Sequence, residues 1–476
     1  MYLSNLYPTP KTFIENETER FTFGGTVTAT ASGLDVLSAE RVQTLWHRFS
    51  CDACELSLLE GSEGFRFTLG RADCSLDTDD EYAIHADHAG VCVVGKDSKG
   101  LLNGIKTLVQ LICPIDLTEG KESFYVSATD IHDAPAIGMR AIHICIFPGT
   151  KLYTIEQAIH VAGFLKFSHI ILEFWGTFRY DCQPALYWEN RSFTKAELRE
   201  LVTLALSYGM EIIPMINHFG HATQSRSCNG RHVTLNRNPR LSRLFEPDGW
   251  TWCISNPDTY KLLAEMRAEQ MEWAGSGNYF HLGFDEAGSF GTCDICRKRV
   301  PHELVAEFIN RLTEDVCKTG RRPIMWHDML IRRDQFPEGC YMEANGHNTH
   351  QALDRLDRRI IIADWNYAYH NGFNPTTPYF LEKGFDTVIC PWDNPENIRS
   401  ITTDVKKFGA MGVIMTTWHH LPNFLSDGAY RANCAWSAGE KNFGTRYCEG
   451  ACLLRRLHDA HGNFEESGWN FCEVEK

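Results

Sequence analysis

The chain has 476 residues and a formal net charge of −15, and 43% of its residues are hydrophobic and 22% are charged. This composition is ordinary for a folded protein. A prior of roughly 150 residues per domain indicates two or three domains, or one large barrel with an added domain. The negative charge and the lack of long basic runs argue against nucleic acid as a partner, because phosphate binding needs clustered Lys and Arg.

The sequence indicates neither secretion nor membrane insertion. Its first eight residues contain no basic segment followed by an apolar core, and no apolar run approaches the roughly 20 residues of a membrane span. We therefore expect a cytoplasmic protein with no membrane partner. The oligomeric state stays open, with a homodimer as one option.

The 18 cysteines are scattered, and many lie within apolar segments. This distribution predicts free thiols in a reducing compartment rather than a disulfide framework. Cys51 with Cys54, and Cys293 with Cys296, have the C-x-x-C spacing of half a zinc site. A structural zinc site needs four ligands and the two pairs lie in different predicted domains, so we interpret each pair as ordinary thiols.

Residues 1–132 differ in pattern from the rest of the chain. Short alternating segments such as Val91-Cys92-Val93-Val94 predict strands, and apolar residues at helical spacing predict a helix over 104–112. We expect a small α+β domain here. Residues 133–476 are then expected to form a larger domain that ends in a C-terminal helical extension.

From Met139 onward, eight short apolar runs recur with helical patterns between them. They lie near 139–146, 169–175, 211–217, 279–284, 322–326, 359–364, 386–390 and 411–416. Strands that alternate with helices imply parallel pairing, and eight of them predict an α/β fold, the closed (β/α)8 TIM barrel. Thr154, Thr194 and Asn256 are predicted to cap the starts of three of the helices.

The fourth run ends in two adjacent acids, Asp285 and Glu286. Barrel enzymes keep their catalytic groups at the C-terminal ends of the strands, so this pair is a candidate catalytic site. The alternative is that both acids simply cap the following helix, because acidic side chains favour helix N-termini. These residues alone leave both interpretations open.

Other polar and aromatic side chains follow the remaining strands, and a barrel would gather them on one face. They are Arg140, Glu173, Trp175, Asn217, His221, Trp326, Asp328, Trp365, Tyr367, Trp392, Asp393, Trp418, His419 and His420. Aromatic faces with a few acids suit the apolar face of a sugar ring. The long segment 218–255, which contains Trp250, is a candidate wall of the pocket. Histidines of this face could instead bind a metal, but no H-x-H or H-E-x-x-H spacing occurs, and we predict neither metal nor other cofactor.

At this point the sequence shows a family resemblance. The run from His281 to Glu286 resembles the His-x-Gly-Gly-Asp-Glu motif of family 20 glycoside hydrolases, the β-N-acetylhexosaminidases. Segments 6–10 and 99–108 resemble the N-terminal α+β domain of that family. Met139-Arg140-Ala141 resembles its Arg-Gly start of strand one, and 213–221 resembles its Ile-Pro-Glu-x-Asp-x-Pro-Gly-His motif. The Leu-Glu-Phe around Glu173 looks closer to the hexosaminidase D branch.

The resemblance implies an exo-acting enzyme that removes terminal GlcNAc or GalNAc from a glycan with retention, the substrate's own acetamide acting as the nucleophile. Glu286 would be the general acid and then the general base, which requires a raised pKa in a sheltered site. Asp285 would stay ionised, accept a hydrogen bond from the acetamide N–H and stabilise the oxazolinium intermediate.

The resemblance also implies a set of substrate-binding residues. Arg140 would hold the 3- and 4-hydroxyls of the sugar through its planar guanidinium, and His221 would support the two carboxylates. The full expected set is Arg140, Glu173, His221, Trp326, Asp328, Tyr367, Trp392, Asp393 and Trp418, with Trp326, Trp392 and Trp418 as walls around the ring and the acetyl methyl.

The chain departs from the family pattern at several positions. Asn217 replaces an acid, Phe284 replaces the second glycine of the motif, Asp393 stands where a Tyr usually orients the acetamide, and His420 stands in place of a Glu. Tyr367 could supply the missing phenol. The preference between GlcNAc and GalNAc therefore stays open, as do two other functions: a sugar-binding homologue with impaired turnover, and a metal-dependent barrel hydrolase.

Overall fold

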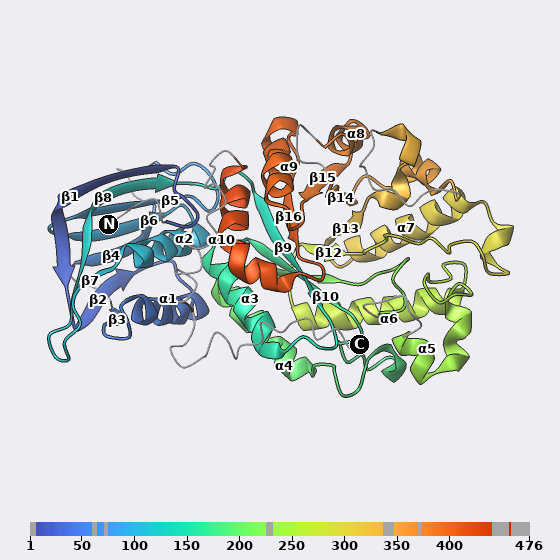
Figure 1. Ribbon diagram of the computed structural model, residues 1–476, viewed down its shortest axis with the longest axis horizontal. Helices are drawn as coiled ribbons and strands as arrows, with labels where there is room; N and C mark the ends of the chain where they lie inside the picture. The colour runs from blue at the N-terminus through green and yellow to red at the C-terminus, as the bar shows by residue number, and fades with distance from the viewer. Residues whose placement is uncertain are drawn as a thin grey trace.

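The computed structural model describes residues 6–59, 64–70, 75–224, 232–336, 347–368, 374–439 and 457. A sheet with two helices lies at one end of the molecule and a barrel ringed by helices at the other (Figure 1). The predicted helical extension beyond residue 439 lies outside the described residues, apart from Leu457.

The N-terminal unit is the expected α+β domain. Its elements are β1 (Thr12–Phe23), β2 (Thr26–Ala31), α1 (Val36–Phe49), β3 (Glu55–Leu58), β4 (Phe65–Leu69), β5 (Tyr82–Asp87), β6 (Gly90–Gly95), α2 (Ser98–Leu108), β7 (Cys113–Asp116) and β8 (Ser123–Asp133). The mixed sheet has the order β1-β8-β5-β6-β4-β2-β3, and β7 pairs with β8. Asp35 and Asp97 cap the two helices, because each side chain accepts a hydrogen bond from a first-turn amide.

All eight predicted barrel strands are present, and they close into a parallel barrel. They are β9 (Met139–Ile146), β10 (His169–Phe174), β11 (Glu211–Met215), β12 (Tyr279–His281), β13 (Arg322–Trp326), β14 (Ile361–Trp365), β15 (Asp386–Cys390) and β16 (Gly412–Thr416), with β16 pairing back to β9. The prediction of a TIM barrel after an α+β domain is therefore confirmed.

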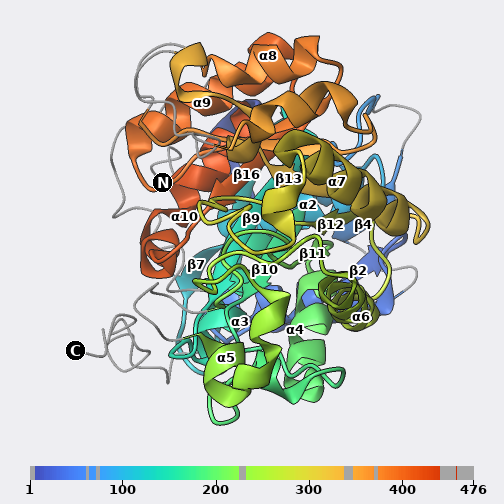
Figure 2. The same ribbon diagram turned by 90° about the vertical axis from the view of Figure 1, so that its right-hand side faces the viewer.

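Helices surround the barrel (Figure 2). They are α3 (Leu152–Phe164), α4 (Lys195–Ser207), α5 (Val233–Arg237), α6 (Pro257–Ala274), α7 (Pro301–Cys317), α8 (Thr376–Glu382), α9 (Pro395–Phe408) and α10 (Leu421–Ser437). Thr194 and Asn256 cap α4 and α6 as predicted. The prediction for Thr154 is wrong, because α3 already begins at Leu152 and places this residue inside its first turn.

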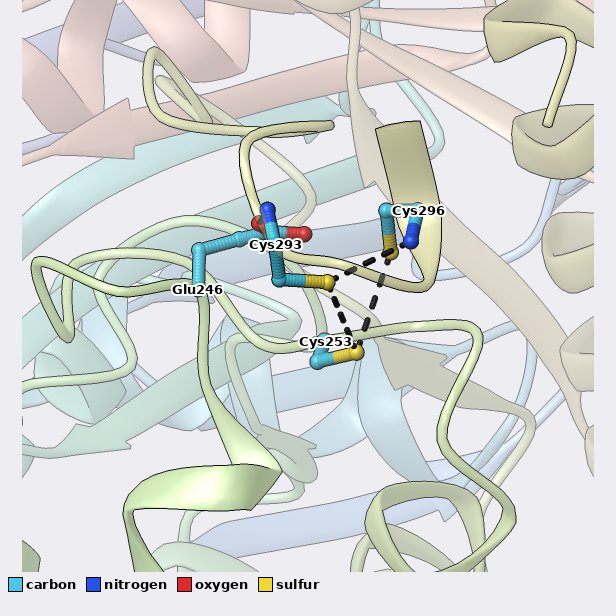
Figure 3. A group of neighbouring side chains, drawn as sticks. All are labelled: Glu246, Cys253, Cys293 and Cys296. Carbon is cyan, nitrogen blue, oxygen red and sulfur yellow. Dashed lines mark hydrogen bonds between the residues drawn. The ribbon is translucent and has the colours of Figure 1, made fainter. Parts of the chain in front are cut away.

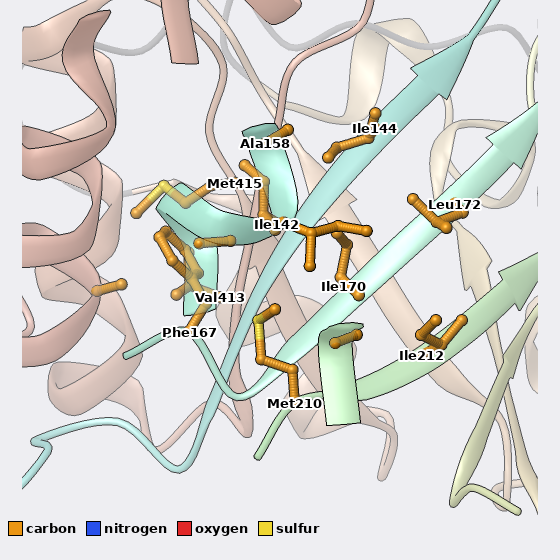
Figure 4. Close-up of a cluster of buried hydrophobic side chains, with 14 of the residues drawn as sticks. Ile142, Ile144, Ala158, Phe167, Ile170, Leu172, Met210, Ile212, Val413 and Met415 are labelled. Atoms are coloured by element: carbon orange, nitrogen blue, oxygen red, sulfur yellow. The ribbon is translucent and has the colours of Figure 1, made fainter. Parts of the chain in front are cut away.

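Two apolar layers hold the barrel together. Inside it, alternate strand residues such as Ala141, Ile171 and Ile324 form one buried cluster. The other face of the same strands packs against the helices, as Figure 4 shows for Ile142 on β9 and Ala158 on α3. Burying one such Ile side chain stabilises the fold by about 1.5–3 kcal/mol relative to leaving it exposed. Because both faces of each strand are covered, the strands are apolar almost throughout.

The two units share a buried interface. Helix α1 contacts α4, and the ring of Phe49 stacks on that of Phe164 with centroids 5.0 Å apart. Lys166 donates a hydrogen bond to the Tyr82 hydroxyl at 2.7 Å and lies 3.6 Å from a carboxylate oxygen of Asp133. Burial lowers the pKa of Lys166 to about 8, against the opposing effect of Asp133. A buried pair of this kind is costly to break, so it opposes separation of the domains.

No disulfide joins any of the twelve cysteines that lie within the described residues, as the sequence predicts for them. None of the helices in this part of the chain combines the length and the apolar character needed to cross a bilayer.

Candidate active site

The base of the site consists of polar and aromatic side chains that point into the barrel near its C-terminal end. His143 on β9, Glu173 on β10, His281 on β12 and Trp326 on β13 are almost completely buried. The Trp326 ring lies 4.3 Å from that of His281 and 5.8 Å from that of His143, measured between centroids. Since the strands of a TIM barrel all end at one face, these residues form one continuous layer below that face.

The chain leaves the regular strand earlier than predicted, directly after His281. Gly283, Phe284 and Glu286 then adopt positive φ angles of 66°, 84° and 48°. This irregular backbone removes the alternation that would send neighbouring side chains to opposite faces. Both acids can therefore enter one site. The helix-capping alternative is wrong, because the next helical segments begin only at Cys296, in a short 3-10 helix, and at Pro301, in α7.

Phe284 occupies a backbone conformation that glycine adopts at no cost, whereas other residues pay about 1–2 kcal/mol. Its ring is fully buried and stacks on Phe219 with a centroid distance of 4.5 Å. The backbone is also tightly packed here, because a Cβ on Gly220 would lie 2.0 Å from the carbonyl oxygen of Asp285. Packing on both sides thus holds the strained turn that presents the acid pair.

His221 joins the two acids. Its Nε2 lies 3.3 Å from Asp285 Oδ2 and 3.3 Å from Glu286 Oε2. Burial alone would lower the pKa of His221, but Asp285 and Glu286 outweigh burial and raise it well above its usual value. Burial raises the pKa of Asp285, while His221 opposes that change. The imidazolium therefore favours an ionised Asp285 in a site where burial favours the neutral acid.

Asp328 holds the backbone of this turn. Its Oδ2 accepts a hydrogen bond from the Glu286 amide at 2.9 Å. Burial, together with the charges of Asp285 and Glu286, raises the pKa of Asp328 well above its usual value. The carboxyl that follows β13 is thus a fully buried support of the acid pair.

Glu173 lies deeper, and both of its oxygens are engaged. Oε1 accepts a hydrogen bond from the Asn217 side-chain amide at 2.6 Å, and Oε2 lies 2.8 Å from His143 Nε2 and 3.3 Å from Cys145 Sγ. Burial alone would raise the pKa of Glu173, but the hydrogen bond and charge of His143, the charge of His221 and the Cys145 hydrogen bond outweigh burial, so the pKa is lowered. Glu173, Asn217 and His221 line a common cavity at the ends of β10 and β11.

Aromatic residues from the last four strands continue around the face. Trp418 packs 5.5 Å from Trp326, and its indole N–H donates a hydrogen bond to the Tyr367 hydroxyl at 2.6 Å. The Tyr367 ring lies 5.3 Å from that of Trp392. Burial raises the pKa of Tyr367, and the charge of Asp285 adds to this effect. The predicted tryptophans are thus brought together, with Trp326 fully buried beneath Trp418.

Asp393 lies at the rim of this face. It pairs with His420, whose side chain is 44% exposed. The His420 ring stacks on Trp392, with centroids 5.1 Å apart. The two departures from the family pattern at strands seven and eight therefore form one pair.

The prediction that Arg140 binds the sugar is wrong. Arg140 is the second residue of β9, about 20 Å from the C-terminal end of that strand at 3.3 Å per residue. Its guanidinium is buried, binds Asp80 Oδ2 at 2.5 Å and donates to the carbonyl oxygens of Ile137 and Lys166. The side chain therefore supports the domain interface at the opposite end of the barrel.

Sequence reasoning missed His143. A histidine in phase with the inward-facing residues of an otherwise apolar strand was the available signal. Trp250, from the long segment 218–255, lies beside the acid pair. Its indole N–H donates to the main-chain carbonyl of Glu286 at 2.6 Å, and its ring lies 4.6 Å from that of His221.

Two groups within the described residues have the composition and spacing of metal ligands. One is His143, Cys145 and Glu173, which are joined by the contacts given above; the other is Glu246 with three cysteines. The histidines that the sequence suggested as an alternative metal site form no such group in this part of the chain.

Comparison with known proteins identifies the family. The model for the glycosyl hydrolase family 20 catalytic domain matches residues 174–420, and that for domain 2 of the same family matches residues 3–134. A β-hexosaminidase of Porphyromonas gingivalis is 23% identical in an alignment of 415 positions that covers 78% of this chain and 52% of the relative. Hexosaminidase D of Bos taurus is 24% identical over 41% of this chain and 58% of its own length. The chain thus spans between about a third and three fifths of the length of these curated relatives.

Solved structures share the fold. An exo β-N-acetylglucosaminidase from Vibrio harveyi, solved in complex with N-acetylglucosamine, superposes with a TM-score of 0.73 at 14% identity, covering 96% of this chain and 78% of that one. A β-N-acetylhexosaminidase from Bacteroides fragilis superposes with a TM-score of 0.70 at 18% identity, covering 97% of this chain and 96% of that one. Because the catalytic-domain model alone covers more than half of the sequence, the chain belongs to glycosyl hydrolase family 20.

Proposed function

We propose that this protein is an exo-β-N-acetylhexosaminidase that removes terminal GlcNAc or GalNAc with retention, through an oxazolinium formed by the substrate's acetamide. One observation carries this proposal: two adjacent carboxylates, Asp285 and Glu286, share one buried histidine at the C-terminal face of the barrel. A sugar-binding protein would not need a general acid. The names of the relatives given above support the same activity.

The different exposure of the two acids supports separate roles. The Glu286 side chain is 34% exposed and that of Asp285 is 5% exposed. Glu286 can therefore reach the leaving oxygen and then water, as a general acid and base must. Asp285 lies deeper, where an ionised carboxylate accepts a hydrogen bond from the acetamide N–H and stabilises the positive charge that develops.

The chemistry then follows in two steps. The acetamide oxygen attacks C1, the bond from C1 to the glycosidic oxygen breaks, and Glu286 gives its proton to that oxygen. In the second step Glu286 takes a proton from water while the water oxygen attacks C1, which reopens the acetamide. The enzyme forms no covalent bond to the sugar in this sequence, in line with the family exception to two-carboxylate catalysis.

The environment of Glu173 argues against an enzymic nucleophile. Both of its oxygens are held by Asn217, His143 and Cys145, as described above. A nucleophile needs a free lone pair directed at C1, which these contacts oppose. We infer instead that Glu173 holds the neighbouring side chains at the base of the pocket in place.

We propose Tyr367 as the phenol that orients the acetamide. Its hydroxyl oxygen accepts a hydrogen bond from the Trp418 indole, so the hydroxyl proton can be donated, to the neighbouring Thr416 side chain or to an arriving acetamide oxygen. Trp392 and Trp418 would wall the sugar, and the Asp393–His420 pair at the rim would contact its hydroxyls.

Paired chromogenic substrates test the proposal. We expect hydrolysis of 4-nitrophenyl β-GlcNAc or β-GalNAc, and the ratio of the two rates reports the preference. Glu286→Gln should lose about 10²- to 10⁴-fold with alkyl leaving groups, which need a proton, while binding is retained. Binding of GlcNAc without turnover of either substrate by the folded protein would instead support a sugar-binding homologue.

A further inference from the structure

A cluster of one carboxylate and three thiols lies outside the carboxylate site. Glu246 and Cys253 come from the long loop after β11, and Cys293 and Cys296 come from the loop that follows the acid pair (Figure 3). Their ligand atoms all lie within 4.8 Å of one another. The sequence indicated only the C-x-x-C half of this group, because the other two residues are 40 to 50 positions away.

Two of the sulfur–sulfur distances match those of a tetrahedron around one ion. Cys253 Sγ lies 3.5 Å from Cys293 Sγ and 3.7 Å from Cys296 Sγ. Four-coordinate zinc binds sulfur at about 2.3 Å, so two sulfur ligands of one tetrahedral ion lie about 3.8 Å apart. A disulfide needs about 2.05 Å and would leave one of the three thiols unused.

Glu246 supplies the observation that most directly indicates a ligand. Its side chain belongs to a residue that is 1% exposed. Oε2 accepts hydrogen bonds from the Cys293 amide at 2.6 Å and from the Thr292 hydroxyl at 3.2 Å. Oε1 is buried and has no hydrogen-bond partner among the residues that the structure describes. A buried carboxylate oxygen that lacks a partner is costly unless a cation compensates it.

The local backbone also suits a thiolate. The Cys296 amide donates a hydrogen bond to Cys293 Sγ at 3.3 Å, within the C-x-x-C turn itself. Hydrogen bonds of this kind stabilise the negative sulfur that binds a metal. Cys253 and Cys296 are 1% and 2% exposed and Cys293 is partly exposed, so three of the four residues, Glu246 among them, are shielded from solvent.

We propose that Glu246, Cys253, Cys293 and Cys296 bind one zinc ion in a closed structural site. Soft thiolates in a tetrahedral arrangement select zinc over magnesium or calcium. On binding, the three thiols lose their protons to solvent, and the site then holds one divalent ion, three thiolates and one carboxylate. Four protein ligands leave no position for water, so this metal takes no part in catalysis.

The zinc would fix the loop that supports the acid pair. Trp250, whose indole binds the Glu286 carbonyl, lies between Glu246 and Cys253 in the sequence. The Thr251 hydroxyl accepts a hydrogen bond from Ser289 at 2.9 Å, which links the same two loops. An ion that joins these loops would hold the backbone of Glu286 without contacting substrate.

Metal content tests the proposal without any substrate, so its failure is distinguishable from failure of the proposed activity. The full chain, purified without chelator, is expected to contain about one zinc per chain by elemental mass spectrometry. The double change Cys253→Ser with Cys293→Ser should remove it. The matched control changes the other C-x-x-C pair, Cys51→Ser with Cys54→Ser, which forms no such ligand group within the described residues, and should keep the zinc.

The wild-type chain itself provides a second readout if the double variant fails to fold. After removal of metal, added cobalt(II) should give thiolate-to-cobalt absorption and the intense visible bands of tetrahedral coordination, and zinc should abolish both. Glu246→Cys should retain zinc, and Glu246→Ala should weaken its retention. The proposal is overturned by a chain without zinc that gives no such spectrum, by zinc that persists in the double variant, or by a native disulfide between Cys253 and Cys293.

Discussion

Replacing His221 with Gln should disable the site while leaving the fold in place. The change keeps a donor near the carboxylates but removes the positive charge that lies 3.3 Å from Asp285 Oδ2. At an effective dielectric constant of about 20, two unit charges at this distance attract each other by about 5 kcal/mol. Asp285 would lose this support in a site where burial already raises its pKa.

The expected kinetic result is a loss of about 10²- to 10³-fold in kcat/KM at neutral pH, the range seen when one stabilising group is removed from a developing charge. Because Asp285 must be ionised to act, the acid limb of the pH profile should also move to higher pH. The assay is hydrolysis of 4-nitrophenyl β-GlcNAc between pH 4 and 9. His88→Gln, at an exposed histidine of the N-terminal domain, is the matched control.

Stability should change with a defined pH dependence. Neighbouring carboxylates raise the pKa of folded His221, so its contribution to the free energy of unfolding is complete below its unfolded pKa near 6.5 and is lost as pH rises through the folded value. The loss in free energy of unfolding caused by His221→Gln, measured with urea, should therefore be larger at pH 5.5 than at pH 9. Wild-type kcat/KM with an unshifted acid limb would refute the role assigned to His221.

Three further changes probe the residues around the acid pair. Gly220→Ala should lower kcat at least about tenfold with a near-normal circular dichroism spectrum, because its Cβ would press on the Asp285 carbonyl; unchanged kcat would contradict the tight packing. Asp328→Asn should raise the unfolding temperature more at pH 8 than at pH 4. The raised pKa of folded Asp328 means that this carboxyl makes the fold less stable as pH rises, and the amide removes that loss. An equal rise in unfolding temperature at both pH values would contradict a raised pKa for Asp328. Tyr367→Phe should lower kcat about 10- to 100-fold with little change in KM, and a pure KM effect would exclude the proposed acetamide contact.

The sequence was sufficient to predict the barrel, because a parallel strand that is covered on both faces must be apolar along its length. Eight such runs separated by helical patterns leave few other architectures. Local similarity was less reliable for single residues. Met139-Arg140 matched a family motif, but a residue at the start of β9 belongs to the opposite end of the barrel from the catalytic face.

Features that depend on distant segments could not be read from the sequence. The local sequence around Phe284 does not indicate that its backbone has a positive φ. That conformation is held by stacking on Phe219 and by the close approach of Gly220, which come from another part of the chain. The cysteine pair at 293 and 296 likewise showed half of a ligand set. The fold adds Glu246 and Cys253 from a loop whose path no local pattern predicts.

The central claim is that the substrate's acetamide is the nucleophile, that Asp285 stabilises the charge that develops on it, and that Glu286 transfers the protons. The most direct measurement is kcat/KM for 4-nitrophenyl glucosaminides that carry N-acetyl, N-fluoroacetyl, N-difluoroacetyl and N-trifluoroacetyl groups. Fluorine withdraws electrons from the attacking oxygen, so the rate should fall with each fluorine, by more than about 10²-fold over the series, which corresponds to about 2.7 kcal/mol of transition-state stabilisation. Equal rates across the series would contradict the account.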